Sequence, residues 1–217
     1  MKFGDTPLSK AQGAILAHSI RIGARTFKKG IALKSGDIKY LGEHGVNSLV
    51  LARLSESDLD ENKAARKLAK ALESTGLSTG RAGTGRCNLI ATRDGLIQID
   101  KKIIDNLNQK NEAITISTVG PNSVLKTGDI AATVKIITFG VSNKIVSACC
   151  KKINQKQPFK LHPFKKLRVG LIQTTFPGFK NSLIEKAHQA TQNRIDALGS
   201  DFSHEIICGH GETEITA

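Results

Sequence analysis

The fold assignment rests on the stretch RVGLIQT at residues 168–174. This continuous apolar run is typical of a strand that is buried on both faces of a parallel sheet. A Pro-Gly turn follows at residues 177–178, and a helical pattern then runs from Asn181 to Leu198. The helix is expected to end at Gly199, because glycine is favoured where a helix terminates in a left-handed conformation.

The residues beyond this helix continue the same kind of pattern. Residues 201–208 are strand-like, and the acidic residues from Glu212 onward are typical of a helix N-terminus. The order strand, helix, strand and helix start predicts the opening of a doubly wound α/β domain. The last helix has only about one turn before Ala217, so we expect residues 168–217 to form an incomplete domain of this class.

A basic segment separates this domain from the rest of the chain. Residues 151–168 are rich in lysine and contain no acidic residue. Such a change of composition marks a domain boundary. Residues 154–167 are therefore predicted to be a basic linker that follows an N-terminal module at residues 1–153.

The N-terminal module is predicted to mix helices and strands, so the fold class is α/β, a mixed α+β module followed by an incomplete doubly wound domain. Helical patterns lie at residues 60–73 and 142–152, and between an N-cap at Ser35 and a terminus at Gly45. Strand patterns lie at residues 14–22, 47–53, 88–100, 113–119 and 131–139. The pair Asp94-Gly95 predicts a β-hairpin within residues 88–100.

The composition is that of a globular chain with an excess of basic residues. The chain has 217 residues, 39% of them hydrophobic, which excludes low-complexity disorder, and its glycines lack the period of collagen. The formal net charge of +13 favours anionic partners such as nucleic acids, acidic lipid surfaces, nucleotides or phosphorylated small molecules. A lysine bias over the whole length is the alternative explanation.

The spacing of the cysteines and the length of the apolar runs indicate the cellular compartment of the protein. Cys87, Cys149, Cys150 and Cys208 show no paired spacing, which is typical of a reducing environment. No signal-peptide pattern is present, and no run of about 18 apolar residues could span a bilayer. We therefore expect a cytoplasmic protein with no membrane partner.

A glycine cluster at residues 79–86 is the first candidate site. Its bare backbone N–H groups and its arginines, Arg81 and Arg86, favour anions. The spacing matches neither a Walker loop nor a dinucleotide fingerprint. Two interpretations stay open, a structural turn and an anion contact by Arg81 or Arg86.

Other candidates are weaker. His204, Cys208 and His210 share parity along a strand, but one unpartnered strand makes a poor metal site, and no metal ligand is assigned. Cys87 beside Arg86 is either a reactive thiol or, as we favour, an ordinary core cysteine. Phe159, His162 and Phe164 alternate with lysines, a pattern that suits single-stranded nucleic acid as a second candidate partner. No catalytic residue is assigned, and enzymatic activity stays open.

Segments along the whole chain resemble molybdenum-cofactor proteins. Residues 29–50 resemble the segment that precedes the molybdopterin-binding domain of molybdopterin molybdotransferases, with KGIAL at 29–33, Asp37-Ile38, Leu41, Gly45-Val46 and Val50. The chain more closely resembles bacterial molybdopterin-binding proteins of the kind often fused to a nucleotidyltransferase domain. The matching segments are MKFG at 1–4, GAILAHS at 13–19, TGRCNL at 84–89, TVKII at 133–137 and RVGLIQT at 168–174.

This resemblance implies that the chain binds molybdopterin, or its nucleotide derivative, in molybdenum-cofactor biosynthesis, with Mg²⁺ as an optional cofactor. The implied site residues are Thr174 and Thr175 after the first strand and Asn181 at the next helix start. The glycine- and serine-rich loop that forms most of the pterin pocket in this family would lie beyond Ala217, so we expect the N-terminal part of a larger protein. The alternatives are a nucleic-acid-binding module and a vestigial fragment, and a homo-oligomer stays open.

Overall fold

The computed structural model describes residues 1–216, and the chain divides into two units, Met1–His162 and Pro163–Ala217. The division falls inside residues 154–167, the predicted basic linker. This segment also contains the end of helix α4 (Asn143–Lys156) and strand β14 (Phe159–Pro163), where Phe159 and Leu161 are buried. Apolar burial therefore holds most of the segment in unit 1, and residues 164–167 connect β14 to the next strand.

The first part of unit 1 is a small β-structure with one helix. Its strand β5 lies between β1 and β2 and is antiparallel to both, so that Leu51 lies opposite Gly4 and Leu16. Buried leucines fill its core. The elements are β1 (Lys2–Pro7), the 3-10 helix η1 (Leu8–Lys10), β2 (Ile15–Leu16), β3 (Ile20–Ile22), β4 (Arg25–Phe27), α1 (Ser35–Glu43) and β5 (Ser48–Arg53).

The start of α1 differs from the sequence-based expectation. Ser35 is the first helical residue rather than the N-cap, which is Lys34. The Asp37 carboxylate closes this end by accepting a hydrogen bond from the Lys34 backbone N–H at 3.0 Å. At the other end, Gly45 has φ +78°, as predicted for a glycine that terminates a helix.

The second part of unit 1 contains the larger core. Its main sheet has the order β10-β12-β8-β7, and two smaller sheets have the orders β11-β9-β14 and β13-β6. The elements besides α4 and β14 are β6 (Asp58–Asp60), α2 (Glu61–Ala71), β7 (Leu77–Thr79), β8 (Arg86–Ala91), β9 (Gly95–Ile99), α3 (Lys101–Lys110), β10 (Ile114–Thr118), β11 (Val124–Leu125), β12 (Ile130–Ile136) and β13 (Gly140–Ser142).

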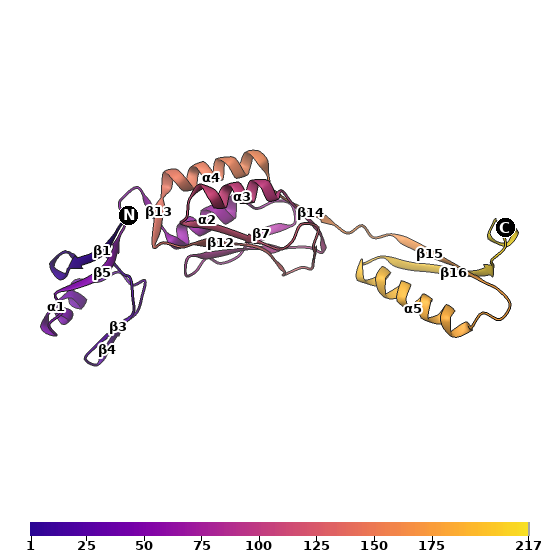
Figure 1. The fold of residues 1–217 in the computed structure, drawn as a ribbon, viewed down its shortest axis with the longest axis horizontal. Helices are drawn as coiled ribbons and strands as arrows, with labels where there is room; N and C mark the ends of the chain where they lie inside the picture. Colours follow the sequence, from indigo (N-terminus) through magenta and orange to yellow (C-terminus); the bar gives the residue numbers. More distant parts are fainter. Residues whose placement is uncertain (217) are drawn as a thin grey trace. The chain divides into compact units, whose positions relative to one another are not determined.

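Three helices lie along one side of the main sheet (Figure 1). Helix α2 packs on β8 and β12, and α3 packs on β10. Helix α4 contacts both α2 and α3, and it buries Val146, Cys149 and Ile153. The amphipathic patterns at residues 60–73 and 142–152 are thus confirmed as helices, because their apolar faces are buried in this layer.

One expectation for this part is wrong, and one helix was not predicted. Residues 88–100 do not form a hairpin: β8 pairs with β12 and β7, whereas β9 pairs with β11 and β14. The Asp94 carboxylate instead accepts hydrogen bonds from the backbone N–H and the hydroxyl of Thr127, at 2.8 and 2.9 Å. Helix α3 was not predicted, since its sequence KKIIDNLNQK is mostly polar and buries only Ile104 and Leu107.

Unit 2 is a strand, helix and strand followed by a short helix, as predicted. Strands β15 (Arg168–Thr175) and β16 (Asp201–Gly209) are parallel, α5 (Asn181–Ala197) connects them, and α6 (Glu212–Thr216) follows. Gln173 is buried and donates a hydrogen bond from Nε2 to the Ile184 carbonyl oxygen of α5 at 3.2 Å. Several strand isoleucines stay exposed, with 60% of Ile172 and 53% of Ile207 accessible.

Limited digestion with trypsin should cut the chain first after Lys165 or Lys166. Both lysines are exposed in a connection without secondary structure, whereas the two cores of unit 1 protect the backbone before it. Mass spectrometry should identify a resistant N-terminal fragment that ends at these lysines. The double variant Lys165→Gln/Lys166→Gln should delay this cut, and equally rapid digestion of both units would contradict the division.

Candidate functional site

The structure places the five predicted site residues in two groups. Thr174, Thr175 and Asn181 lie in unit 2, whereas Arg81 and Arg86 lie in unit 1. The two groups are therefore treated as separate candidate sites.

The group in unit 2 lies at the carboxyl end of β15. Thr174 and Thr175 are half-buried, and they lie opposite Cys208 and Gly209 of β16. The Thr174 hydroxyl lies 2.8 Å from Nδ1 of His210, a residue that sequence reasoning did not connect with this edge. Asn181 is exposed at the first position of α5, where no side chain caps the helix. This edge offers hydroxyl, imidazole and backbone N–H groups to an anion, while the Glu214 carboxyl group beside Gly209 opposes one.

The same edge does not suit a metal ion. Magnesium prefers carboxylate oxygens, and Thr174, Thr175 and Asn181 supply none. His204 and His210 bond to different hydroxyls, those of Ser203 and Thr174. Across residues 1–216, no group of three His, Cys, Asp or Glu side chains is arranged to hold a metal ion.

In unit 1, the glycine cluster at residues 79–86 forms the turn between β7 and β8. The backbone groups of Gly83 and Arg86 exchange two hydrogen bonds of 2.9 Å, and Thr84 and Gly85 follow with φ of +46° and +69°. A positive φ is strained for a β-branched residue such as Thr84. A Cβ at position 85 would lie 2.9 Å from the Ile136 carbonyl oxygen, so this position requires glycine.

This turn brings Arg86 to a cavity of about 390 Å³, the basic pocket. Thr84 and Arg86 of this turn also line a neighbouring, more open cavity of about 560 Å³, together with Arg81. The basic pocket is lined by residues of four different segments, namely Lys29, Gly30, Glu61, Thr84, Arg86, Lys135, Ile136, Ile137 and Phe139. The structure therefore brings both predicted arginines to adjoining cavities.

Glu61 is the acidic residue of the basic pocket. Burial raises the pKa of its carboxyl, while the charges of Lys29 and Arg86 lower it and that of Asp60 raises it further. Sequence reasoning missed Glu61, Lys29, Lys135 and Phe139 as pocket residues. No sequence signal marked these residues: Lys135 lies opposite Arg86 in the β8–β12 pairing, and this pairing was not predicted from the sequence.

Cys87, next to Arg86, is a core residue and not a reactive thiol. It is buried, and its Sγ lies 3.4 Å from the Gly80 carbonyl oxygen. Burial raises the pKa of the thiol, so the nucleophilic thiolate is disfavoured.

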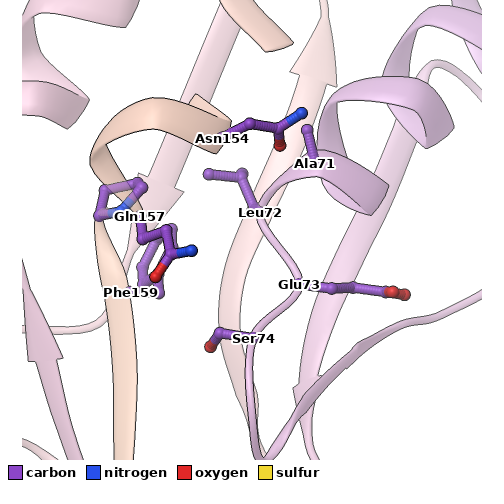
Figure 2. A pocket seen from close by; sticks show the side chains of 8 residues that line it. Ala71, Leu72, Glu73, Ser74, Asn154, Gln157 and Phe159 are labelled. Carbon is purple, nitrogen blue, oxygen red and sulfur yellow. The ribbon is translucent and has the colours of Figure 1, made fainter. Parts of the chain in front are cut away.

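A smaller cavity of about 190 Å³ lies between the end of α2 and the end of α4 (Figure 2). Its acidic residue, Glu73, points away from Gln157 and Phe159 in this view. The Glu73 carboxylate accepts hydrogen bonds from Lys70 Nζ at 2.6 Å and from the Thr79 backbone N–H at 2.9 Å. Burial alone raises the pKa of Glu73, but these hydrogen bonds and that from the Thr79 hydroxyl lower it to about 2. Glu73 therefore joins α2 to β7 and has a structural role.

We expect Glu73→Gln to lower the free energy of unfolding of unit 1 at pH 7 by about 1–3 kcal/mol, because hydrogen bonds to a charged acceptor are lost. The folded-state pKa of about 2 lies below the ordinary 4.5, so this stabilisation is present above pH 4.5 and disappears as the pH falls toward 2. Urea denaturation of both proteins between pH 7 and pH 3 measures the difference.

The control for this series is Glu56→Gln, which removes an exposed carboxyl from the same unit. It should change stability little at any pH. A Glu73→Gln effect that stays constant down to pH 3 would contradict the assigned role.

Comparison with known proteins adds one match. Residues 5–53, which contain α1 and strands β2 to β5, match the model of a domain of unknown function, DUF8806. No curated protein matches the chain. Within residues 1–216, none of the helices has the length and apolar character needed to cross a bilayer.

Proposed function

We propose that the chain binds molybdopterin or its nucleotide derivative and takes part in molybdenum-cofactor biosynthesis. The observation that carries this proposal is the parallel β15–α5–β16 arrangement, with Thr174 and Thr175 at the carboxyl end of the first strand. Ligands of open parallel sheets bind in the crevice outside the carboxyl ends of the strands. The resemblance of the RVGLIQT segment to molybdopterin-binding proteins points to the same edge.

The proposal includes a doubly wound fold for unit 2. Strands of parallel sheets are normally covered on both faces, so a domain of this class buries its strand residues under further helices. In unit 2, however, Ile172, Ile206 and Ile207 are at least half exposed. Their exposure supports a sheet that is completed by additional elements in its functional form.

The charge of the chain gives this edge no specific support. Molybdopterin carries a phosphate, but the formal net charge of +13 lies in unit 1, whereas unit 2 has equal numbers of basic and acidic residues. A single helix terminus contributes only about 0.3–1 kcal/mol to anion binding. The hydroxyl of Thr174 is therefore expected to supply a substantial share of the binding free energy at this edge.

Nucleic-acid binding is less well supported than pterin binding. The stacking interpretation of residues 151–168 requires exposed aromatic rings, but Phe159 is 2% exposed and packs in the core of unit 1. His162 is bonded through Nε2 to Gln98 Oε1 at 3.0 Å. The lysines of this segment attract the phosphates of a nucleic acid, but this attraction does not depend on the base sequence.

Calorimetric titration of the full chain with molybdopterin, under anaerobic conditions, tests the proposal. We expect only weak binding by the chain alone, and about tenfold weaker binding by Thr174→Ala because a hydrogen bond to a charged phosphate is lost. Thr174→Ser should retain most of the affinity. Thr191→Ala, which removes a threonine hydroxyl in the middle of α5, is the matched control.

Each result of this titration has a defined meaning. Absence of binding both by the unmodified chain and by the chain extended through a homologous complete domain would contradict the proposed function. Binding that is equal for the unmodified chain and for Thr174→Ala would place the ligand elsewhere and remove the assigned site.

A further inference from the structure

The basic pocket of unit 1 holds two like charges that face each other on paired strands. Arg86 of β8 lies directly opposite Lys135 of β12. Like charges at directly opposite positions destabilise an antiparallel pair. Within residues 1–216, neither side chain forms an ion pair with a carboxylate. The protein therefore maintains a local repulsion that an anion between the two side chains would remove.

Further groups give the pocket a defined net charge. Lys29 lies on its wall and Glu61 supplies the acidic group, so three cations face one carboxyl. With Glu61 ionised, the local charge is two positive units. A phosphate monoester carries about −1.5 to −2 at neutral pH and has three strong acceptor oxygens. Its charge matches that of the pocket.

The pocket also has an apolar wall. Ile136, Ile137 and Phe139 line it beside the cations. The Phe139 ring stacks on Phe3, with ring centroids 6.3 Å apart, and the ammonium of Lys29 lies 5.4 Å from its centroid. The volume of about 390 Å³ lies within the range of roughly 300–1,000 Å³ that is usual for small-molecule sites.

The backbone around the pocket is rigidly fixed. Gly85 donates its N–H to Asn62 Oδ1 at 2.9 Å, and its carbonyl oxygen accepts a hydrogen bond from the Ile136 N–H at 2.8 Å. These bonds fix the turn before Arg86 against both α2 and β12. The strained Thr84 next to them is a second feature that is common at ligand sites.

We infer that the basic pocket binds a small phosphate monoester that carries an apolar or aromatic body. Arg86 and Lys135 bind the phosphate, Lys29 adds a third positive charge, and Ile137 and Phe139 contact the body of the ligand. Glu61 limits the affinity for more highly charged anions, because its carboxylate repels them. This site lies in unit 1, involves none of the residues proposed at the carboxyl end of β15, and does not depend on the proposed function.

Calorimetry and two-dimensional NMR of the full chain, with adenosine 5′-monophosphate as the probe and adenosine as its dephosphorylated control, test the inference. Adenosine 5′-monophosphate should bind and shift the amide resonances of Thr84–Arg86 and Lys135–Ile137, and adenosine should not. Riboflavin 5′-phosphate with riboflavin provides a second such pair. Lack of binding by both phosphorylated probes would overturn the inference.

Variants test which charged side chains bind the ligand. Lys135→Ala and Arg86→Ala should each weaken binding by about tenfold or more, since a charge-assisted hydrogen bond is lost. Glu61→Gln should strengthen it by about threefold, because a nearby negative charge is removed. Lys102→Ala, an exposed lysine of α3, is the matched control and should have no effect. Thermal unfolding of each variant shows whether the fold is retained.

The remaining outcomes also decide between explanations. Equal binding by Lys135→Ala and the unmodified chain, with both folded, would show that the pocket is not the site. A single-stranded oligonucleotide that binds more tightly than the mononucleotide and shifts the same resonances would replace the inference with a nucleic-acid interface.

Discussion

The close packing of the alanine-rich face of helix α2 determines the arrangement of unit 1. Ala64, Ala65, Leu68 and Ala69 are completely buried, and α2 contacts β8, β12, β7, β6, β13 and α4. Small side chains let the helix axis approach the sheet, so larger residues at these positions would push the two apart. The position of α2 then places the residues at both of its ends. At the start, Glu61 lines the basic pocket and Asn62 accepts the hydrogen bond from Gly85. Glu73 follows the other end and bonds to Thr79 of β7.

Much of the secondary structure was predictable because burial leaves a periodic pattern. Helices α2, α4 and α5 show apolar residues at helical spacing, and β10, β12 and β15 show apolar runs. Helix α3 was missed because its sequence is mostly polar and buries only Ile104 and Leu107, although Asp100 is a typical N-cap residue. The Asp100 side chain caps it by accepting a hydrogen bond from the Ile103 N–H at 3.2 Å.

Strand pairing was much less predictable than strand position. The Asp94-Gly95 signal is local and carries no information about distant partners. In the structure Gly95 begins β9, and Asp94 bonds to Thr127. The core favours a sheet in which β8 lies between β12 and β7, because this order buries Leu89 and Ala91 under the helices. The site shows the same limit: Arg86 was a candidate from its own neighbours, whereas Lys135 became one only through the long-range β8–β12 pairing.

The pairing of β6 with β13 has a consequence for the order of events during synthesis. Asp58–Asp60 is made early, but its partner Gly140–Ser142 follows only after the whole intervening sheet. Glu61 also donates its N–H to the Phe139 carbonyl oxygen, so the start of α2 is fixed only once this later segment has left the ribosome. A nascent chain therefore leaves the apolar face of α2 uncovered until the strands that pack on it have been synthesised.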